Sequence, residues 1–358
     1  MLKFIAKKVF YGIVVLLGVI TTVFFLFNVL PGDPASIMLG QRANKEAVEA
    51  IHRDLGTNLP IMEQYALYLN DLFVVSFHDF KDTESHWYLN PQKYSWIPLF
   101  QVSESKVIVL KIPFLRRSYI TKRPVSDIII ETLPETAVLA FTSIVIASII
   151  GVFLGIVAAV KRNTFYDKLS LVLSVLGMAA PSFFVGLIIA WLFGYVLTEY
   201  TGLSPTGSLY DIDVWNGEVL ELKNLILPSI TLGIRPLAIV VQLMRSSLLD
   251  VMSQDYIRTA KAKGLSFYAI ILKHALKNAL NPVVTAISGW FAGLMAGAVF
   301  VEFIFSWKGI GYEVFEALTK NDLPVVMGAT LIFATIFVFI NILVDIAYGI
   351  LDPRVRFK

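Results

Sequence analysis

The sequence contains no cysteine, and only 16% of its 358 residues are charged. The missing cysteines exclude disulfide bonds, thiolate metal sites and cysteine nucleophiles. An average soluble domain carries about 25% charged residues, so this chain is too apolar for a soluble protein of its length. Because 56% of the residues are hydrophobic and the net charge is only +3, the composition indicates a membrane protein. It gives no support for nucleic-acid binding.

Sequence motifs for catalysis are missing as well. No G-x-x-x-x-G-K-[ST] phosphate loop occurs, so we expect no nucleotide binding by that route. The four histidines form no H-E-x-x-H pair, and no G-x-S-x-G sequence is present. We therefore expect no catalytic residue, no metal site and no cofactor. Any ATP hydrolysis that drives this protein belongs to another subunit.

Six apolar runs are long enough to cross a bilayer, which takes about 20 residues of helix. The first run has a longer apolar core than a signal peptide and no small-residue cleavage site follows it, which favours a retained anchor. The expected fold is therefore an all-α membrane protein with six transmembrane helices. The runs are Val9–Leu30, Thr136–Val160, Leu169–Thr198, Leu225–Leu249, Pro282–Phe303 and Leu323–Leu351.

Lysine and arginine residues predict the orientation, because loops rich in these residues stay in the cytoplasm. The basic residues gather before the first run, between the second and third, between the fourth and fifth, and after the sixth. We therefore predict that both termini are cytoplasmic and that the protein lies in the cytoplasmic (inner) membrane. The residues are Lys3, Lys7, Lys8, Lys161, Arg162, Lys168, Arg258, Lys261, Lys263, Arg354, Arg356 and Lys358.

A long segment, 31–125, separates the first two runs and is expected outside the cell membrane as a small α+β insertion. Asn44 can cap an amphipathic helix that ends at Gly56, and Ile61–Leu72 is a second expected helix. The β-branched stretch Lys106–Lys111 predicts a strand. We interpret the insertion's aromatic residues as the core of a small packed cap, with a docking surface for an external protein as the alternative. The predicted organisation is 1–30, 31–125 and a five-helix core, 126–358.

The most informative polar stretch lies between the fourth and fifth runs, in the loop 250–278. Asp255 is expected to cap a short helix that ends at Lys263, and Gly264 to supply a left-handed residue that stops it. Ser266 can cap the next helix. Ile257 and Ala260 give the short helix an apolar face. Such an element at a membrane surface is placed to contact a soluble partner, although basic residues there are often only anchors to anionic lipid.

These residues resemble the cytoplasmic "EAA" loop of ATP-binding-cassette (ABC) import permeases, in the form found in the dipeptide and oligopeptide permease family. Arg258-Thr259-Ala260 followed by Gly264 carries the likeness. Other motifs agree with it in the same order along the chain. They are Leu30-Pro31-Gly32-Asp33-Pro34, Lys122-Arg123-Pro124-Val125, Glu302 to Trp307 with Gly309 and Gly311, Asn341 to Asp345, and Leu351-Asp352-Pro353-Arg354.

The resemblance implies a permease of the first-subunit type that forms half of a translocation pathway for peptides. Its implied partners are a second, homologous permease, two cytoplasmic ABC ATPases and an external substrate-binding protein, all assembled in the lipid bilayer. It implies that the short helix is a coupling helix seated on an ATPase. The implied coupling residues are Asp255, Tyr256, Arg258, Thr259, Ala260, Lys261, Lys263 and Gly264. Similar permeases import oligosaccharides or nickel, so these substrates stay open.

Charged and polar groups inside the runs are candidates for the substrate pathway, because such groups are costly in lipid. Arg235 either meets a substrate carboxylate or pairs with a carboxylate on another helix. Asp345, on one face with Asn341, could pair with Arg354 or Arg356. In the resembled family, Glu302 and the loop that contains Trp307 lie at the external mouth, which implies a gate or docking role. Lys308 stands where that family usually has proline, which predicts a less rigid loop.

Two glycine stripes predict close helix packing, because small residues four apart let helix backbones approach each other in lipid. Gly151 and Gly155 form one stripe, and Gly289, Gly293 and Gly297 form the other. Packing within the chain is the simpler interpretation. For the second stripe, contact with the partner permease or with the moving pathway is the alternative.

Two other classes compete with the permease. An ion-driven secondary transporter would also have intramembrane charges, but it usually shows internal repeats with broken helices, and we find no convincing repeat here. A membrane-anchored scaffold for an external domain needs fewer than six spans.

Overall fold

The structure is a computed structural model that describes residues 2–29, 35, 38, 45, 48, 49, 52, 56–83, 85–213, 215 and 217–351. The chain divides into two compact units. The core unit comprises Met1–Val9, Thr132–Phe315 and Ile336–Lys358, and the insertion unit comprises Phe10–Glu131 and Glu316–Thr335. The expected Leu30–Pro34 motif, most of the helix expected after Asn44 and the basic C-terminal tail lie outside the described residues.

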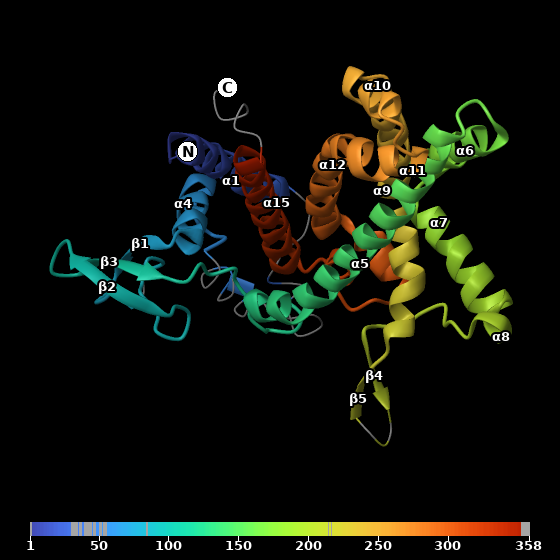
Figure 1. The fold of residues 1–358 in the computed structure, drawn as a ribbon. Coiled ribbons are helices and arrows are strands. Elements are labelled where there is room, and N and C mark those ends of the chain that lie inside the picture. Colours follow the sequence, from blue (N-terminus) through green and yellow to red (C-terminus); the bar gives the residue numbers. More distant parts are fainter. Residues whose placement is uncertain are drawn as a thin grey trace. The chain divides into compact units, whose positions relative to one another are not determined.

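The described part of the chain is mostly helical (Figure 1). Four helices are long and apolar enough to cross a membrane: α1 (Leu2–Val29), α5 (Val125–Val160), α9 (Ile226–Met252) and α15 (Leu323–Leu351). Two further spans are possible if each of two bent helix pairs crosses once. The described helices thus allow four to six spans, and the count of six stays a prediction.

The third apolar run is not one continuous helix, which corrects the expectation of a single unbroken helix. It forms α6 (Phe165–Ala179), α7 (Ser182–Ile189) and the π-helical segment η2 (Ala190–Val196), with a bend of 108° between the two halves. Pro181 lies at the break. Proline has no N–H to continue the helix and its ring clashes with the preceding turn, so the apolar run cannot stay straight there.

The insertion unit combines helices with a small antiparallel sheet. Helix α4 (Ile61–Leu72) has the predicted bounds. Its Tyr68 packs against Val23 and Phe24 of α1 and against Met327 and Leu331 of α15. Burying these apolar and aromatic groups together stabilises the unit.

The sheet has the order β1-β3-β2, with β1 at Val75–Asp79, β2 at Trp96–Gln101 and β3 at Lys106–Lys111. The predicted strand is therefore the central one. Its alternate residues Val107 and Val109 are buried, as expected for a half-buried strand. Pro98 lies on the edge strand β2, where a missing N–H costs little.

Helix α9 is central to the packing of the core unit and contacts α6, α7 and α12 (Leu276–Gly297). Beyond α12 follow α13 (Val299–Phe305) and α14 (Ile310–Thr319). A two-stranded hairpin, β4 (Tyr210–Asp213) with β5 (Gly217–Leu220), precedes α9 after the short α8 (Thr198–Thr201). This hairpin has no counterpart among the sequence predictions.

Candidate functional site: an intramembrane cavity and a coupling surface

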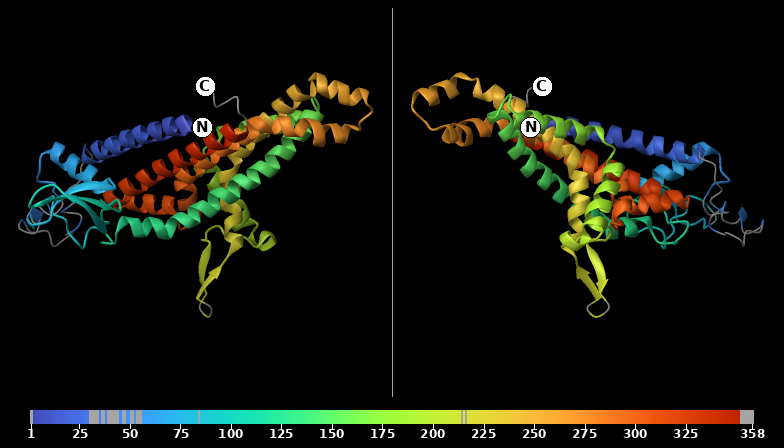
Figure 2. Two further views of the ribbon diagram at one scale, coloured as in Figure 1. Left: turned by 60° about the vertical axis from the view of Figure 1, so that its left-hand side comes forward. Right: turned by 90° about the vertical axis from the view of Figure 1, so that its right-hand side faces the viewer.

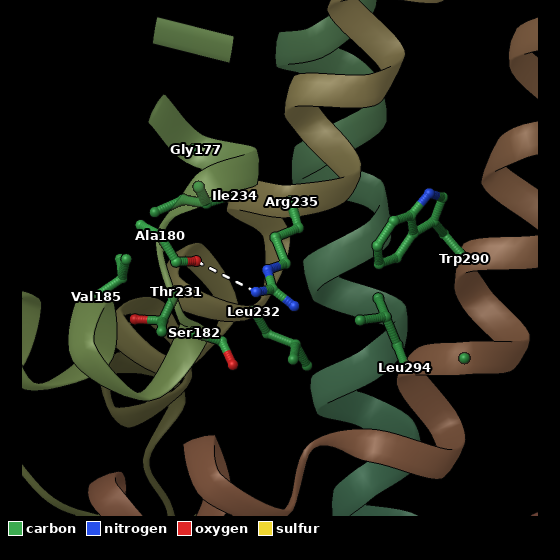
Figure 3. Close-up of a pocket in the computed structure, with 11 residues that line it drawn as sticks. Gly177, Ala180, Ser182, Val185, Thr231, Leu232, Ile234, Arg235, Trp290 and Leu294 are labelled. Atoms are coloured by element: carbon green, nitrogen blue, oxygen red, sulfur yellow. Dashed lines mark hydrogen bonds between the residues drawn. The ribbon is translucent and has the colours of Figure 1, made fainter. Parts of the chain in front are cut away.

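Arg235 lies beside the break between α6 and α7 (Figure 3). Because a helix leaves its last carbonyl groups without internal partners, the end of α6 offers free acceptors. The Arg235 guanidinium donates to one of them, the carbonyl oxygen of Ala180, at 3.3 Å. The Arg235 side chain is exposed, and no carboxylate among the described residues forms an ion pair with it. The structure therefore gives no support to the expectation of a structural ion pair.

A cavity of about 160 Å³ surrounds this guanidinium. Its walls come from the α6–α7 break, from α9 and from α12, whose Trp290 and Leu294 face Arg235 across the space (Figure 3). Gly293 also lines it, which joins one glycine stripe to the predicted intramembrane cation. The arrangement presents one cation at a mostly apolar wall, which suits an anionic group on a bound molecule.

The two glycine stripes behave differently. A Cβ on Gly155 would lie 2.6 Å from the Cβ of Met244 and 2.9 Å from the carbonyl oxygen of Val241, so α5 and α9 approach closely there. Gly151 meets Val240 in the same way. A Cβ on Gly289 or Gly293 would meet nothing within 4 Å. Packing within the chain therefore accounts for the first stripe and not for these two residues of the second.

Glu302 and Trp307 are fully buried and do not line this cavity. One Glu302 carboxylate oxygen accepts from the Thr136 hydroxyl at 2.8 Å, and the other accepts from the Tyr312 N–H at 3.1 Å. The Trp307 indole donates to the carbonyl oxygen of Glu135 at 3.0 Å, and the Lys308 N–H donates to the Ser208 hydroxyl at 3.2 Å. A proline at 308 could not make this last bond, so the departure from the family pattern adds a contact to the loop.

Asp345 has a partner that the sequence analysis did not name. Its carboxylate lies 2.7 Å from the Lys8 ammonium, and both side chains are 37% exposed. Arg354 and Arg356, the partners expected for Asp345, lie outside the described residues. Asn341 donates to the carbonyl oxygen of Phe337 in its own helix. Neither residue is among those that line the cavity or donate to Glu302.

The expected coupling helix is α10 (Asp255–Ala262), and it protrudes with α11 (Phe267–Ala269) from the rest of the core unit (Figure 2). Ile257 and Ala260 are buried in an apolar cluster with residues of α9, of the π-helical segment η4 (Ile270–Ala275) and of α12, and α10 packs directly against η4. Gly264 has a φ of +76° and Ser266 caps α11, as predicted. Asp255 does not cap α10, which is a correction: the N-cap is Gln254, and Asp255 is the first helical residue, 3.3 Å from Arg258.

The exposed surface of this loop carries polar side chains and several large apolar ones. Arg258, Thr259, Lys261 and Lys263 are exposed. The exposed large side chains of Tyr256, Leu265, Phe267, Tyr268 and Leu272 surround them. The apolar face of α10 is thus buried, while its polar residues stay exposed.

The sequence analysis did not predict an ion pair that joins α6 to α9. Asp167 at the start of α6 is buried and accepts two hydrogen bonds from the Arg245 guanidinium, at 2.6 and 2.9 Å. Asp167 also accepts from the Asn163 N–H at 2.8 Å. The basic residues beside it were counted only as orientation signals, and no spacing in the sequence links residue 167 to residue 245. The pair fixes α6 to α9, on which Arg235 also lies.

Comparison with known protein families identifies the family of this chain. The family model described as "Binding-protein-dependent transport system inner membrane component" matches residues 151–357. The N-terminal model for the membrane components of these systems matches residues 1–86. The chain belongs to this family.

Relatives of this permease match it over its full length. It is 34% identical to the dipeptide transport system permease protein DppB of Alkalihalophilus pseudofirmus, with both chains covered completely. It is 33% identical to the di/tripeptide permease DppB of Pseudomonas aeruginosa, with 99% of each covered. It is 32% identical to the glutathione permease GsiC of Escherichia coli K12, with both covered completely. The predicted membership of the ABC dipeptide and oligopeptide permeases is confirmed.

A solved structure, that of inward-facing forms of the MetNI methionine ABC transporter, is 16% identical to the permease. It covers 59% of the permease and 94% of its own chain at a TM-score of 0.41, which is too low to support an argument. Family membership makes the protein an integral inner-membrane subunit of an ABC importer, and a pore subunit instead of an enzyme.

Proposed function

We propose that this permease forms half of a pathway that imports peptides delivered by an external binding protein. The observation that carries the proposal is full-length likeness to permeases named for dipeptides, di/tripeptides and glutathione, all of which are peptides. The other half of the pathway is a second, homologous permease. None of these three relatives is named as an oligosaccharide or nickel permease. Membership of the family also argues against the two other classes, an ion-driven secondary transporter and a membrane-anchored scaffold.

Arg235 is the residue proposed to meet the substrate. Peptides carry a carboxylate at the C-terminus, and a guanidinium binds carboxylates through two parallel hydrogen bonds. In the cavity, Arg235 has one long bond to a backbone carbonyl and no carboxylate partner among the described residues. Its charge is thus available to a passing carboxylate, while the mostly apolar wall accepts varied side chains without strong selection.

We propose that two cytoplasmic ATPases, which dimerise when they bind nucleotide, supply the energy for import. Helix α10, seated on one of them, moves with it and reorients the membrane helices. The buried Ile257 and Ala260 support this role, because they join α10 to an apolar cluster that also contains residues of α9 and α12. A ligand shifts the equilibrium between two orientations of the membrane helices only if its affinity for them differs. The ATPase must therefore bind α10 with a different affinity in each orientation.

The test is ATP-dependent uptake by the complete transporter in proteoliposomes, with dipeptides that carry either a free or an amidated C-terminus. Wild type should take up the free-acid peptide, and Arg235→Gln should reduce that uptake about tenfold, the loss expected for one charge-assisted hydrogen bond. Arg235→Lys should retain part of the activity because the charge remains. Uptake of the amidated peptide should be slow in wild type and little changed by either substitution.

Two outcomes would contradict the role of Arg235 and the proposed substrate class, respectively. Equal loss of both peptides in Arg235→Gln would show that Arg235 maintains the structure and does not meet the carboxylate. Absence of ATP-dependent uptake of any peptide by wild type would overturn the proposed substrate class.

A further inference from the structure

The insertion unit contains a second and larger cavity, which we call the insertion cavity, with a volume of about 390 Å³. Its walls come from α4, from the segment that follows β1 and from the chain before α5. Sites for small molecules in proteins usually measure about 300–1,000 Å³, so the insertion cavity is large enough for a ligand. None of its lining residues belongs to the cavity beside Arg235.

Cationic side chains outnumber carboxylates among the described residues that line the cavity. Lys93, Arg116, Arg117 and Lys122 line the cavity, and Asp71 is the one carboxylate among the described lining residues. Arg117 and Lys122 are exposed at the rim, while Lys93 and Arg116 are half-buried. Such an excess of one charge in a concave surface attracts a ligand of the opposite charge.

Asp71 is already neutralised inside the protein. Its carboxylate accepts from the Tyr94 hydroxyl at 2.6 Å and lies 3.1 Å from the Lys93 ammonium and 4.0 Å from Arg116. The buried Lys111 ammonium donates to the Asp71 carbonyl oxygen at 2.6 Å. Burial, opposed by Asp71 and assisted by the Lys93 charge, lowers the pKa of Lys111 to about 8. The positive charge at the rim is therefore not balanced by Asp71.

The rim is held in place before any ligand arrives. Arg116 and Lys122 both have left-handed backbones, with φ of 65° and 62°. Between them, the Ser118 hydroxyl donates to the Asp322 carboxylate at 2.5 Å, and the Tyr119 N–H donates to the same carboxylate at 2.8 Å. Asp322 is 4% exposed and precedes α15 in the same unit. A preorganised rim loses little entropy when it binds a ligand.

We propose that the insertion cavity binds a phosphate group, carried either by a small phosphate compound or by the headgroup of an anionic lipid. Phosphate fits better than a single carboxylate, because its additional oxygens can accept from several separate cations. The Tyr94, Phe114 and Tyr119 rings give the cavity apolar walls for the rest of such a ligand. A lipid source is within reach, because α1 and the first half of α15, both candidate spans, belong to the same unit.

The experiment compares the full-length wild-type chain with a double variant, Arg117→Gln with Lys122→Gln, in nanodiscs. These two side chains do not touch Asp71, so the variant should fold. The matched control is Lys81→Gln with Lys106→Gln, which removes the same charge from exposed positions of the insertion that do not line the cavity. Inorganic phosphate binding is measured by calorimetry in phosphatidylcholine nanodiscs. Retention of phosphatidylglycerol over phosphatidylcholine is measured by native mass spectrometry.

Saturable phosphate binding that weakens at least tenfold in the double variant and not in the control supports a small phosphate compound. Selective phosphatidylglycerol retention with the same dependence, and without phosphate binding, supports the lipid headgroup. Restoration by Arg117→Lys with Lys122→Arg shows that charge, and not shape, is responsible. Equal behaviour of the double variant and the control in both assays, or no binding of either probe by wild type, overturns the proposal. Neither assay depends on transport, so failure here leaves the proposed function untouched.

Discussion

At the scale of single residues, the buried Glu302 explains its neighbouring glycines. A Cβ on Gly309 would collide with the Glu302 carboxylate and the Thr136 hydroxyl, and a Cβ on Gly311 would lie 2.9 Å from the carboxylate. A buried carboxyl group must keep its hydrogen bonds, so its donors have to approach this closely. Space around Glu302 therefore requires glycine at 309, and at Gly311 the Val299 backbone also requires it, because the Val299 Cα would lie 2.7 Å from the added Cβ. Glu302 organises the loop on which a gate or docking role would depend.

The two glycine stripes predict different effects of a glycine-to-alanine substitution on stability. Gly155→Ala should lower the free energy of unfolding by about 1–3 kcal/mol, because the added methyl group overpacks against α9. Gly289→Ala should leave it unchanged or raise it by up to about 1 kcal/mol, since alanine favours helix and the position is open. Denaturant titration of both variants in detergent measures the difference. If Gly289 faces the partner permease or the pathway, Gly289→Leu should reduce uptake while the isolated chain keeps its stability. Equal destabilisation at both positions would contradict the distinction.

A second residue-scale prediction concerns His78 in the sheet of the insertion unit. Its Nδ1 faces the carbonyl oxygen of Trp87, which can only accept, and its Nε2 lies 3.0 Å from the Ser76 hydroxyl. Burial, and then the Lys111 charge, lower the pKa of His78 to about 4, while the Trp87 carbonyl and Asp71 oppose the shift. Lys93 adds to the lowering. The folded state thus keeps the ring neutral.

The unfolded chain binds a proton at His78 near pH 6.5, so it holds more protons than the folded chain between about pH 6.5 and pH 4. The insertion should lose roughly 2 kcal/mol of stability as the pH falls through this window. Hydrogen exchange of the β1 and β3 amides in the full chain measures the loss. His78→Gln should flatten the profile. An unchanged slope in that variant would assign the effect to another group.

At the scale of elements, the sequence predicted local structure well where chain-local signals agree. The bounds of α4 and β3 match the prediction, because proline precedes α4 and β3 is a short run rich in β-branched residues between two lysines. The α6–α7 break was missed although Pro181 was visible, since a proline inside an apolar run either kinks or ends a helix. Its neighbours decide which of the two occurs. The Asp255 cap was wrong because Gln254 already takes the extended N-cap geometry.

The element-scale prediction concerns the end of α10. Gly264 has a left-handed backbone, and no atom lies within 4 Å of the position that a Cβ would occupy, so Gly264→Val adds backbone strain and no collision. That strain, about 1–2 kcal/mol, should be relieved by tilting α10. The assembled transporter should then hydrolyse ATP with little peptide uptake. Gly202→Val is the control, because Gly202 also has a positive φ and open space but lies after α8. Coupled uptake in Gly264→Val, or equal uncoupling in both variants, would refute the lever role of α10.

At the scale of the whole molecule, the absence of cysteine allows a clean test of orientation. Lys261→Cys on α10 should react with a membrane-impermeant maleimide only in inverted vesicles. Lys106→Cys on β3 should react only in right-side-out vesicles, because the insertion is predicted outside. Both positions are exposed, so burial will not hide the thiol. Labelling of both residues from one side would refute the predicted topology. The unmodified chain, which has no cysteine to label, is the negative control.

By itself, the sequence determined the class of the protein, the apolar segments and the family, because composition, hydrophobic length and short motifs are properties of the chain alone. It also located α10 and Gly264, whose capping signals are local. Only the tertiary structure decided which glycines are packed, that Lys8 is the partner of Asp345, and that Arg245 holds Asp167. Only it showed that Arg235 faces a cavity beside a helix break. These features join residues far apart in the chain, and no local pattern specifies which distant groups meet when apolar helices pack.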